Sequence, residues 1–192
     1  MTKNARRRVA EEAARLLVEG SEREYLQAKE RAISMLGLSG MTHLPSNRVI
    51  RDCMAQLTEC ELGADEVKRR VREMRQIAVE IMQIIEDFDP YLIGSTLTGK
   101  IRSSSDIDLH AYSDEHPLLV DLLANFEYKE VEEEIVENRK GKFVHLKWFE
   151  NDYPVEITVY PWSWRDIVQI SSVTGKPMQR MGLESLKKML KM

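Results

Sequence analysis

The first half of the chain spaces its apolar residues three and four positions apart, which is typical of amphipathic helices. Glycines interrupt this pattern between the successive runs. Before the second run, Ser21 and Glu24 have the spacing of a capping box, in which Ser21 caps the helix and Glu24 reaches back. The pattern predicts helices over residues 4–19, from this capping box to about 36, from Pro45-Ser46 onward, and over 65–87.

The run over 65–87 carries its apolar residues at alternating spacings of four and three. Because about three heptads is short for a coiled coil, we interpret the stripe as a seam within one molecule, with a homodimer as the alternative. The basic residues between Lys68 and Arg75 are explained either by a solvated helix face or by contact with phosphates or RNA. The seam consists of Val67, Val71, Met74, Ala78, Ile81 and Ile85.

After Pro90 the helical spacing gives way to alternation, which predicts strands. Between Tyr91 and Tyr112 the pattern indicates a short strand, a Gly94-Ser95 turn, a further glycine at Gly99, and a second strand. One face of the second strand is apolar, and the other carries two aspartates and a histidine. The apolar face has Ile107, Leu109 and Ala111, and the polar face has Asp106, Asp108 and His110.

The rest of the pattern predicts one more helix, three more strands and a helical C-terminal segment. The first of these strands is rich in glutamate, which suits the edge of a sheet because charge discourages pairing with other chains. The other two strands join through Asn151-Asp152, a hairpin signal. The elements are a helix over 115–126, the edge strand over 128–137, a turn over 138–141, strands over Lys142–Phe149 and Tyr153–Tyr160, and helices near Trp164–Ile170 and Pro177–Leu190.

These elements predict an α/β (α+β) fold, in which a small mixed sheet with flanking helices follows a helical region. We expect the helical region to cover residues 1–88, the sheet-containing core 89–165, and a C-terminal helical segment 166–192. A chain of 192 residues with 43% hydrophobic and 31% charged residues is long enough and apolar enough to bury such a core.

The charge of the chain indicates no nucleic-acid partner. The net charge is −4, and residues 1–90 carry 15 basic and 16 acidic side chains while 91–192 carry 13 and 16. Cys53 and Cys60 lie about 10 Å apart if they share one helix, too far for a disulfide, which predicts buried free thiols. No apolar run approaches the roughly 18 residues of a membrane span, and no targeting segment is evident. We therefore expect a cytoplasmic protein without membrane contact.

The chemistry of the chain is concentrated between Gly94 and Asp108. Carboxylates at positions i and i+2 of a strand lie roughly 6.5–7 Å apart and repel unless a cation lies between them. Mg²⁺ is usually bound by one or two protein carboxylates together with substrate phosphates, which suits Asp106 and Asp108. Backbone N–H groups of the Gly94-Ser95 turn can hold phosphate oxygens. The stretch therefore predicts a site for a magnesium nucleotide.

This stretch resembles the signature of the DNA polymerase β-like nucleotidyltransferase superfamily, especially the minimal nucleotidyltransferases and their antibiotic-modifying relatives. The resemblance rests on Gly94-Ser95, Gly99, and Ser105-Asp106-Ile107-Asp108-Leu109, and it extends over about 89–161. The family has a third carboxylate on a neighbouring strand, for which Glu156 is the candidate. Aspartate is more common there than glutamate, so the resemblance leaves open whether Glu156 binds metal or acts mainly as a base.

The resemblance implies Mg²⁺-dependent nucleotidyl transfer with two metal ions. Asp106, Asp108 and Glu156 would be both the catalytic residues and the metal ligands. Gly94 and Ser95 would hold the phosphates of an NTP, with ATP the expected donor. An acceptor hydroxyl on a small molecule or a protein would then displace pyrophosphate. Lys100, Arg102 and Ser105 are candidate nucleotide-binding residues, although solvated loop charges explain the first two and a strand cap the third.

Two other functions fit the same residues. In the first alternative, the chain is an antitoxin-like interaction protein with a nucleotidyltransferase fold. It is then non-catalytic or depends on a small helical protein partner, and the partner docks on the helical half. It is also alternatively an enzyme that adds nucleotides to RNA, which the even charge balance disfavours. The acceptor and the base preference are not encoded in any residue pattern that we can identify.

Overall fold

The computed structural model describes residues 3–38, 44–128, 130–138, 141–171 and 173–191. Their contacts divide the chain into two compact units. The helical unit contains the chain up to Val67 together with Lys100–Ser103 and Ile170–Lys176, and the sheet unit contains Lys68–Gly99, Ser104–Gln169 and the chain from Pro177 onward. The domain boundaries expected from the sequence, after residues 88 and 165, stay a prediction.

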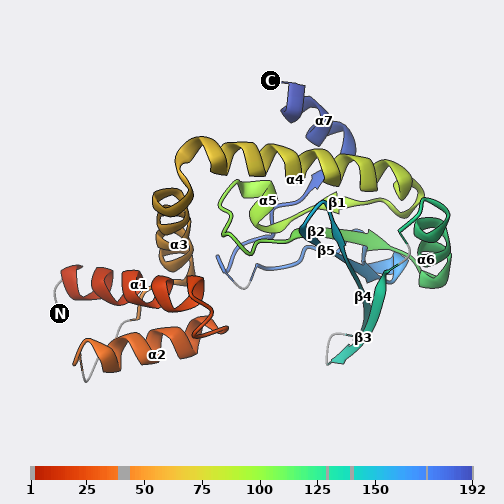
Figure 1. The fold of residues 1–192 in the computed structure, drawn as a ribbon. Coiled ribbons are helices and arrows are strands. Elements are labelled where there is room, and N and C mark those ends of the chain that lie inside the picture. Colours follow the sequence, from red (N-terminus) through yellow and green to blue (C-terminus); the bar gives the residue numbers. More distant parts are fainter. Residues whose placement is uncertain (1–2, 39–43, 129, 139–140, 172, 192) are drawn as a thin grey trace. The chain divides into compact units, whose positions relative to one another are not determined.

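The helical unit is built from three amphipathic helices, α1 (Lys3–Val18), α2 (Tyr25–Met35) and α3 (Asn47–Leu62), as the apolar spacing predicts (Figure 1). Ser46 caps α3, its hydroxyl accepting a hydrogen bond from the Val49 N–H at 3.4 Å. Small residues dominate the core, which lets the helices approach closely. The buried residues are Val9, Ala10, Ala13, Ala14, Leu16, Leu17, Ala28, Ala32, Ile50 and Met54.

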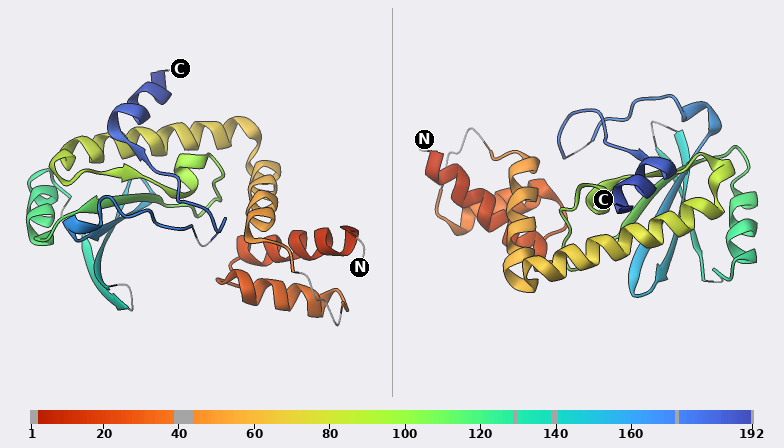
Figure 2. Two further views of the ribbon diagram at one scale, coloured as in Figure 1. Left: turned by 180° about the vertical axis from the view of Figure 1, so that it is seen from behind. Right: turned by 90° about the horizontal axis from the view of Figure 1, so that it is seen from above.

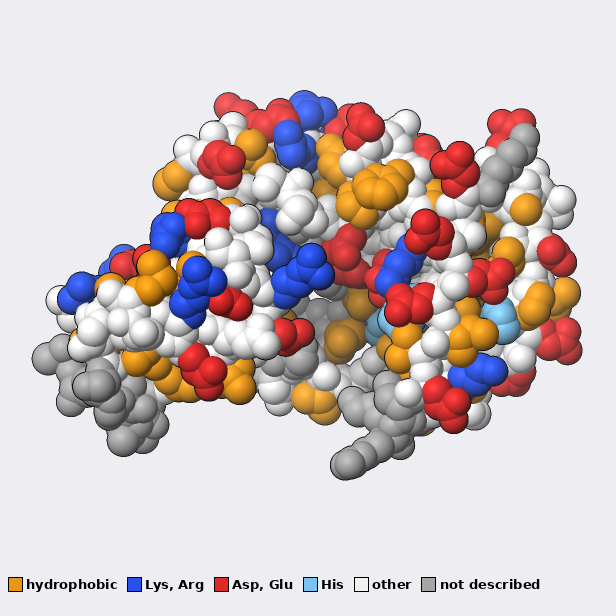
Figure 3. Space-filling model, turned by 60° about the horizontal axis from the view of Figure 1, so that its bottom comes forward, with side chains coloured by type: hydrophobic (Ala, Val, Ile, Leu, Met, Phe, Trp, Pro, Cys, Tyr) orange, Lys and Arg blue, Asp and Glu red, His pale blue; other side chains and the backbone are white. Residues whose placement is uncertain are grey.

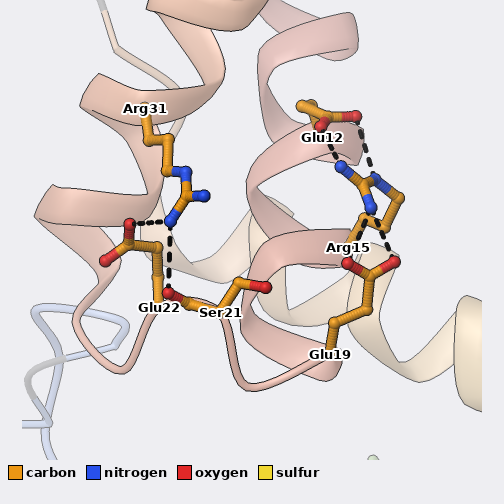
Figure 4. A network of polar contacts seen from close by, with 6 residues as sticks. All are labelled: Glu12, Arg15, Glu19, Ser21, Glu22 and Arg31. Atoms are coloured by element: carbon orange, nitrogen blue, oxygen red, sulfur yellow. Dashed lines mark hydrogen bonds and ion pairs between the residues drawn. The ribbon is translucent and has the colours of Figure 1, made fainter.

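The predicted capping box before α2 is wrong. Arg31 of α2 instead contacts the segment that precedes the helix, and a separate set of ion pairs runs along α1 (Figure 4). Glu24 occupies the N-cap position of α2, but its side chain makes no capping hydrogen bond. Glu22 instead accepts a hydrogen bond from Arg31 at 2.8 Å, and Arg31 also reaches the Ser21 carbonyl at 3.4 Å. The segment before α2 is therefore held by Arg31, one and a half turns into the helix, and the serine hydroxyl is not needed as a cap.

The sheet unit contains a mixed sheet of six strands in the order β3-β4-β5-β2-β1-β6 (Figures 1 and 2). Among the strands that the structure describes, β2 and β5 form the one parallel pair, and the other pairs are antiparallel. β3 is an edge strand, as predicted. The strands are β1 (Tyr91–Leu92), β2 (Ile107–Tyr112), β3 (Glu132–Asn138), β4 (Gly141–Glu150), β5 (Tyr153–Tyr160) and β6 (Met181–Gly182).

One face of this sheet is apolar and packs against helices. Ile107, Leu109 and Ile157 project from it and are at most 1% exposed. The long helix α4 (Ala64–Ile84) runs along the sheet with its seam buried, which confirms the seam as intramolecular, and α6 (His116–Asn125) lies at one end (Figure 2). A short 3-10 helix, η1 (Glu86–Phe88), links α4 to β1. This packing fixes which side chains of β2 and β5 face away from the helices.

The C-terminal part differs from the prediction of two helices. Only a 3-10 turn, η2 (Trp162–Trp164), forms where the first helix was expected, because the Gln169 carbonyl accepts a hydrogen bond from the Met178 N–H at 2.8 Å and the chain pairs with itself. The second helix, α7 (Leu183–Lys191), begins later than Pro177, since β6 first pairs with β1. The turn predicted over 138–141 lies partly outside the described residues.

Two further expectations concern cysteines and membranes. Cys53 and Cys60 are free thiols, as predicted, but the expected burial is wrong, since Cys53 is half-buried and Cys60 is exposed. Within the described ranges, the structure has no helix that combines the length and the apolar character needed to span a bilayer.

Candidate nucleotide-binding site

Two carboxylates meet where β2 and β5 run parallel. Asp108 pairs in register with Glu156, and the next pairs on the same face are His110 with Thr158 and Tyr112 with Tyr160. Because residues in register on neighbouring strands project to the same side, Asp108 and Glu156 lie side by side about 5 Å apart at the backbone. The polar alternation of the sequence thus becomes a polar face of the sheet.

The Gly94 turn lies directly against this face. Gly94 begins the five-residue helix α5 (Gly94–Thr98) with φ +73°, and the preceding Ile93 N–H donates to the Asp108 carbonyl at 3.0 Å. A Cβ on Gly94 would lie 2.2 Å from Asp108 Oδ2. Glycine is therefore required here twice, for its positive φ and because the backbone itself touches the Asp108 carboxylate.

Side chains hold both ends of the connection from α5 to β2. The Ser95 hydroxyl lies 3.1 Å from the Ser105 hydroxyl, and Thr96 Oγ1 donates to the Asp106 carbonyl at 2.9 Å. Asp106 itself lies just before β2 rather than within it. These bonds place Asp106 next to the start of α5. Ser105 is 5% exposed, so its predicted nucleotide contact is at present replaced by a contact with Ser95.

Arg75 of α4 supports the turn from behind. Its guanidinium donates to the Thr96 carbonyl at 3.0 Å and to the Leu97 carbonyl at 2.8 Å. These carbonyls have no partner within so short a helix, and the arginine supplies one. Burial lowers the pKa of Arg75 from its ordinary value. The basic stretch of α4 therefore includes one residue with a definite internal role, which the sequence pattern did not distinguish from its neighbours.

The predicted nucleotide-binding residues are divided between the two compact units. Lys100 and Arg102 belong to the helical unit, although they lie between α5 and β2 in the sequence. Lys100 Nζ forms an ion pair with Asp52 of α3 at 2.6 Å. Gly94, Ser95, Ser105, Asp106, Asp108 and Glu156 all belong to the sheet unit.

Glu156 has two neighbours on β4 that sequence reasoning missed. Its Oε1 lies 2.6 Å from His145 Nδ1, and its Oε2 lies 3.8 Å from Lys147 Nζ. Lys147 also bonds to Glu134 of β3 at 2.5 Å. The Asn151-Asp152 hairpin signal could have revealed these neighbours. Both residues have positive φ, as a two-residue type I′ turn requires. Counting outward from such a turn pairs Lys147 with Glu156.

The histidine on β2 belongs to the interior. His110 is 4% exposed, and its ring packs edge-on against Tyr160 with centroids 4.8 Å apart. Burial, followed by the charge of Arg180 and by His145, lowers the pKa of His110 to about 4. Tyr160 in turn stacks on Trp164 at 5.7 Å. The polar face therefore ends in an aromatic cluster just beyond the carboxylates.

A cavity of about 670 Å³ opens beside Asp106 and Glu156. Of the described residues, three aromatic side chains and Lys147 line it together with further carboxylates. The aromatic residues are Tyr128, Trp148 and Phe149, and the additional carboxylates are Glu127, Glu130, Glu132 and Glu150. On the face shown in Figure 3, acidic side chains are interspersed with lysine and arginine, and the basic side chains form no continuous area.

The donor set suits Mg²⁺ together with a phosphate ligand. Among the described residues, no three His, Cys, Asp or Glu side chains form a group that would hold a metal alone. Asp106, Asp108 and Glu156 as a ligand set stay a prediction, in which substrate phosphates complete the coordination of Mg²⁺. The close contact of the Gly94 backbone with Asp108 leaves the turn amides next to a carboxylate, so phosphate and carboxylate oxygens would meet at one ion.

A scan of protein-family models found no match to the chain, and a search of curated proteins found none either. Solved structures do match. One is Cid1, described as an RNA terminal uridylyl transferase, with 14% identity over 47% of this chain and 30% of Cid1 at a TM-score of 0.33. A cytoplasmic RNA terminal U-transferase has 15% identity over 60% of this chain and 38% of its own, at 0.34.

A third match is the GLD-2/RNP-8 complex, with 18% identity over 57% of this chain and 39% of that chain, at a TM-score of 0.33. The chain thus spans less than two-fifths of the length of these proteins. At such scores the similarity carries no conclusion about activity, which rests on the site itself.

Proposed function

We propose that the protein is a Mg²⁺-dependent nucleotidyltransferase that moves an NMP from an NTP, with ATP the expected donor, to a hydroxyl on a small molecule or protein. One observation carries this proposal. Asp108 and Glu156 lie in register on parallel strands, and the Gly94 backbone touches the Asp108 carboxylate. The arrangement supplies adjacent oxygen ligands and phosphate-binding amides in one place.

Each residue has a role in this reaction. Backbone amides at Gly94 and Ser95 would bind the β- and γ-phosphates, Asp106 and Asp108 would hold Mg²⁺, and Glu156 would share a second ion with them. When bound, the metal would neutralise charge on the phosphates and lower the pKa of the acceptor hydroxyl. The hydroxyl oxygen forms a bond to the α-phosphorus while the bond from that phosphorus to the β-phosphate oxygen breaks. The electron pair leaves with pyrophosphate, and Glu156 accepts the hydroxyl proton.

The cavity beside Asp106 and Glu156 favours an acceptor other than RNA. Among the residues that the structure describes, four glutamates line it in addition to the site carboxylates, together with Lys147. Such a lining repels a polyanion, and binding of a nucleic acid backbone normally depends on lysine and arginine contacts with phosphates. Tyr128, Trp148 and Phe149 provide an apolar wall instead. A compact acceptor or a protein segment that carries a hydroxyl fits this lining.

The test is pyrophosphate release with each NTP in the presence of Mg²⁺. Asp106→Asn should lower the rate roughly 100-fold or more, because charge stabilisation at the transferring phosphate is lost. The control is Asp121→Asn, an exposed aspartate on α6, which should behave as wild type. Equal rates in wild type and Asp106→Asn would contradict the proposal.

Nucleotide binding is measurable without knowledge of the acceptor. A bound NTP at 100 times its Kd adds about 2.7 kcal/mol, or roughly 5–10 °C in melting temperature. We expect a Mg²⁺-dependent shift with one or two NTPs, absent from the double variant Asp106→Asn/Asp108→Asn. A shift that persists in the double variant would place the nucleotide elsewhere.

A second candidate is an antitoxin-like interaction protein that docks a small helical partner. The observation that favours it is the exposure of large apolar residues on α2 and α3: Leu26 is 57% exposed, Met35 54% and Val49 43%. Size measurement and purification with products of neighbouring genes separate the two functions. A stable complex together with no turnover in the free protein favours the partner, and a free protein that turns over excludes a purely non-catalytic role.

A further inference from the structure

His145 of β4 lies at hydrogen-bond distance from the proposed base, Glu156. Its Nδ1 is 2.6 Å from Glu156 Oε1, and the two side chains are 23% and 29% exposed. The contact is diagonal across the β4–β5 ladder, because His145 pairs in register with Thr158 and Glu156 with Lys147. The two residues therefore share one face of adjacent strands.

The chemistry of the pair sets the ring's tautomer. A carboxylate only accepts hydrogen bonds, so the hydrogen between His145 and Glu156 is on Nδ1. Thr158 Oγ1 lies 3.4 Å from the same nitrogen, too far to compete with a bond of 2.6 Å. The second carboxylate oxygen, Oε2, is left next to Lys147 at 3.8 Å. The two oxygens of Glu156 thus have different surroundings.

We propose that His145 is a positioning residue that holds Glu156 in one orientation for nucleotidyl transfer, by donating from Nδ1 to Oε1. The inference rests on the proposed function, in which Glu156 takes the acceptor proton and shares a metal ion. A hydrogen-bonded oxygen no longer rotates freely, so the Glu156 carboxylate, which lines the cavity together with Asp106, is held in one orientation. Groups that orient a ligating or reacting side chain in this way typically change metal affinity or activity about 10–100-fold when removed.

The alternative is that the pair only stabilises the hairpin. Two substitutions separate the roles, since the amide nitrogen of asparagine occupies the place of Nδ1 and leucine has a similar shape without a donor. His145→Asn should keep kcat and Mn²⁺ affinity near wild type. His145→Leu should lower kcat at least tenfold and weaken Mn²⁺ binding, with little change in the KM for the NTP, because the Gly94 turn is untouched. A hairpin role predicts equal turnover for both variants once each is shown to be folded.

Measurements without turnover keep the inference distinct from the proposed function. Nitrogen NMR of the metal-free protein should show His145 protonated on Nδ1, with the signal shifted in Glu156→Gln. Mn²⁺ binding with a non-hydrolysable NTP, followed by electron paramagnetic resonance, should weaken at least tenfold in His145→Leu and recover in His145→Asn. Protonation on Nε2, or unchanged Mn²⁺ binding and turnover in His145→Leu, would overturn the role of His145.

Failure of the parent proposal has a different pattern. If wild type binds no Mn²⁺ with any NTP and Asp106→Asn matches it in every assay, the nucleotidyltransferase proposal fails, and the role of His145 falls with it. If wild type binds Mn²⁺ and responds to Asp106→Asn but not to His145→Leu, only the role of His145 is lost.

Discussion

Asp108 and Glu156 lie side by side on parallel strands, and the Gly94 backbone touches the carboxylate of Asp108. The chain returns to this point only after α6 and the long β3–β4 hairpin, since parallel neighbours need a crossover. The pairing therefore depends on the whole sheet unit. It also means that substitutions in the surrounding supports should act on the site from a distance.

Gly94→Ala tests the contact between the turn and Asp108. The added Cβ would meet Asp108 Oδ2 at 2.2 Å, so the turn or the carboxylate must move, and NTP affinity should fall at least tenfold. The matched control is Gly20→Ala, whose φ of +72° is nearly the same and whose Cβ would meet nothing within 4 Å. Both should lose about 1 kcal/mol of stability from the positive φ, but only Gly94→Ala should lose nucleotide binding in a thermal-shift titration.

If the two glycine variants bind NTP equally well, the Gly94 turn does not contact the nucleotide.

Arg75→Met tests the support behind α5. The substitution removes hydrogen bonds to the Thr96 and Leu97 carbonyls and leaves both without that partner. Hydrogen bonds from a charged donor contribute about 1.5–3 kcal/mol each, and Arg75 is only half-buried, so we expect the loss of two to lower the free energy of unfolding in urea by about 3 kcal/mol. Arg72→Met, an exposed arginine on the same helix, is the control and should change stability by less than about 0.5 kcal/mol.

Arg75→Met should also weaken NTP binding because the turn loosens. Full stability in this variant would show that water replaces the guanidinium at no cost.

The Tyr153 hydroxyl should lose its proton at a higher pH than an ordinary tyrosine. Burial, and then a hydrogen bond to the Glu73 carboxylate at 2.7 Å, raise its pKa to about 12. A raised pKa means that the folded state keeps the proton longer than the unfolded state. The stabilisation is therefore complete below pH 10 and is lost as the pH rises through about 12. Carbon NMR of the tyrosine rings measures this titration directly.

In Glu73→Gln the pKa of Tyr153 should fall, yet stay above the ordinary value because burial remains. Glu80→Gln, exposed on the same helix, should leave it unchanged. A Tyr153 that titrates normally in wild type would show that the bond between α4 and β5 does not persist in solution.

Much of the architecture was predictable because it depends on local periodicity. The seam of α4, the edge position of β3, the β4–β5 hairpin and the alternation of β2 all follow from residues close in sequence. The errors occurred where a helix signal competed with a contact to a residue nine or ten positions away. The Ser21 capping box gave way to the contacts of Arg31, and the helix expected near 164–170 gave way to pairing between Gln169 and Met178.

The sequence by itself determined the types of group at the site, since a glycine turn followed by two aspartates on one strand face is written in consecutive residues. Only the tertiary structure decided which residues lie next to these groups. It placed Glu156 in register with Asp108, His145 and Lys147 beside Glu156, and Arg75 behind the turn, while Lys100 pairs with Asp52 in the helical unit. The physical reason is that strand register and helix packing are set by burial summed over a whole unit, which no local pattern of residues records.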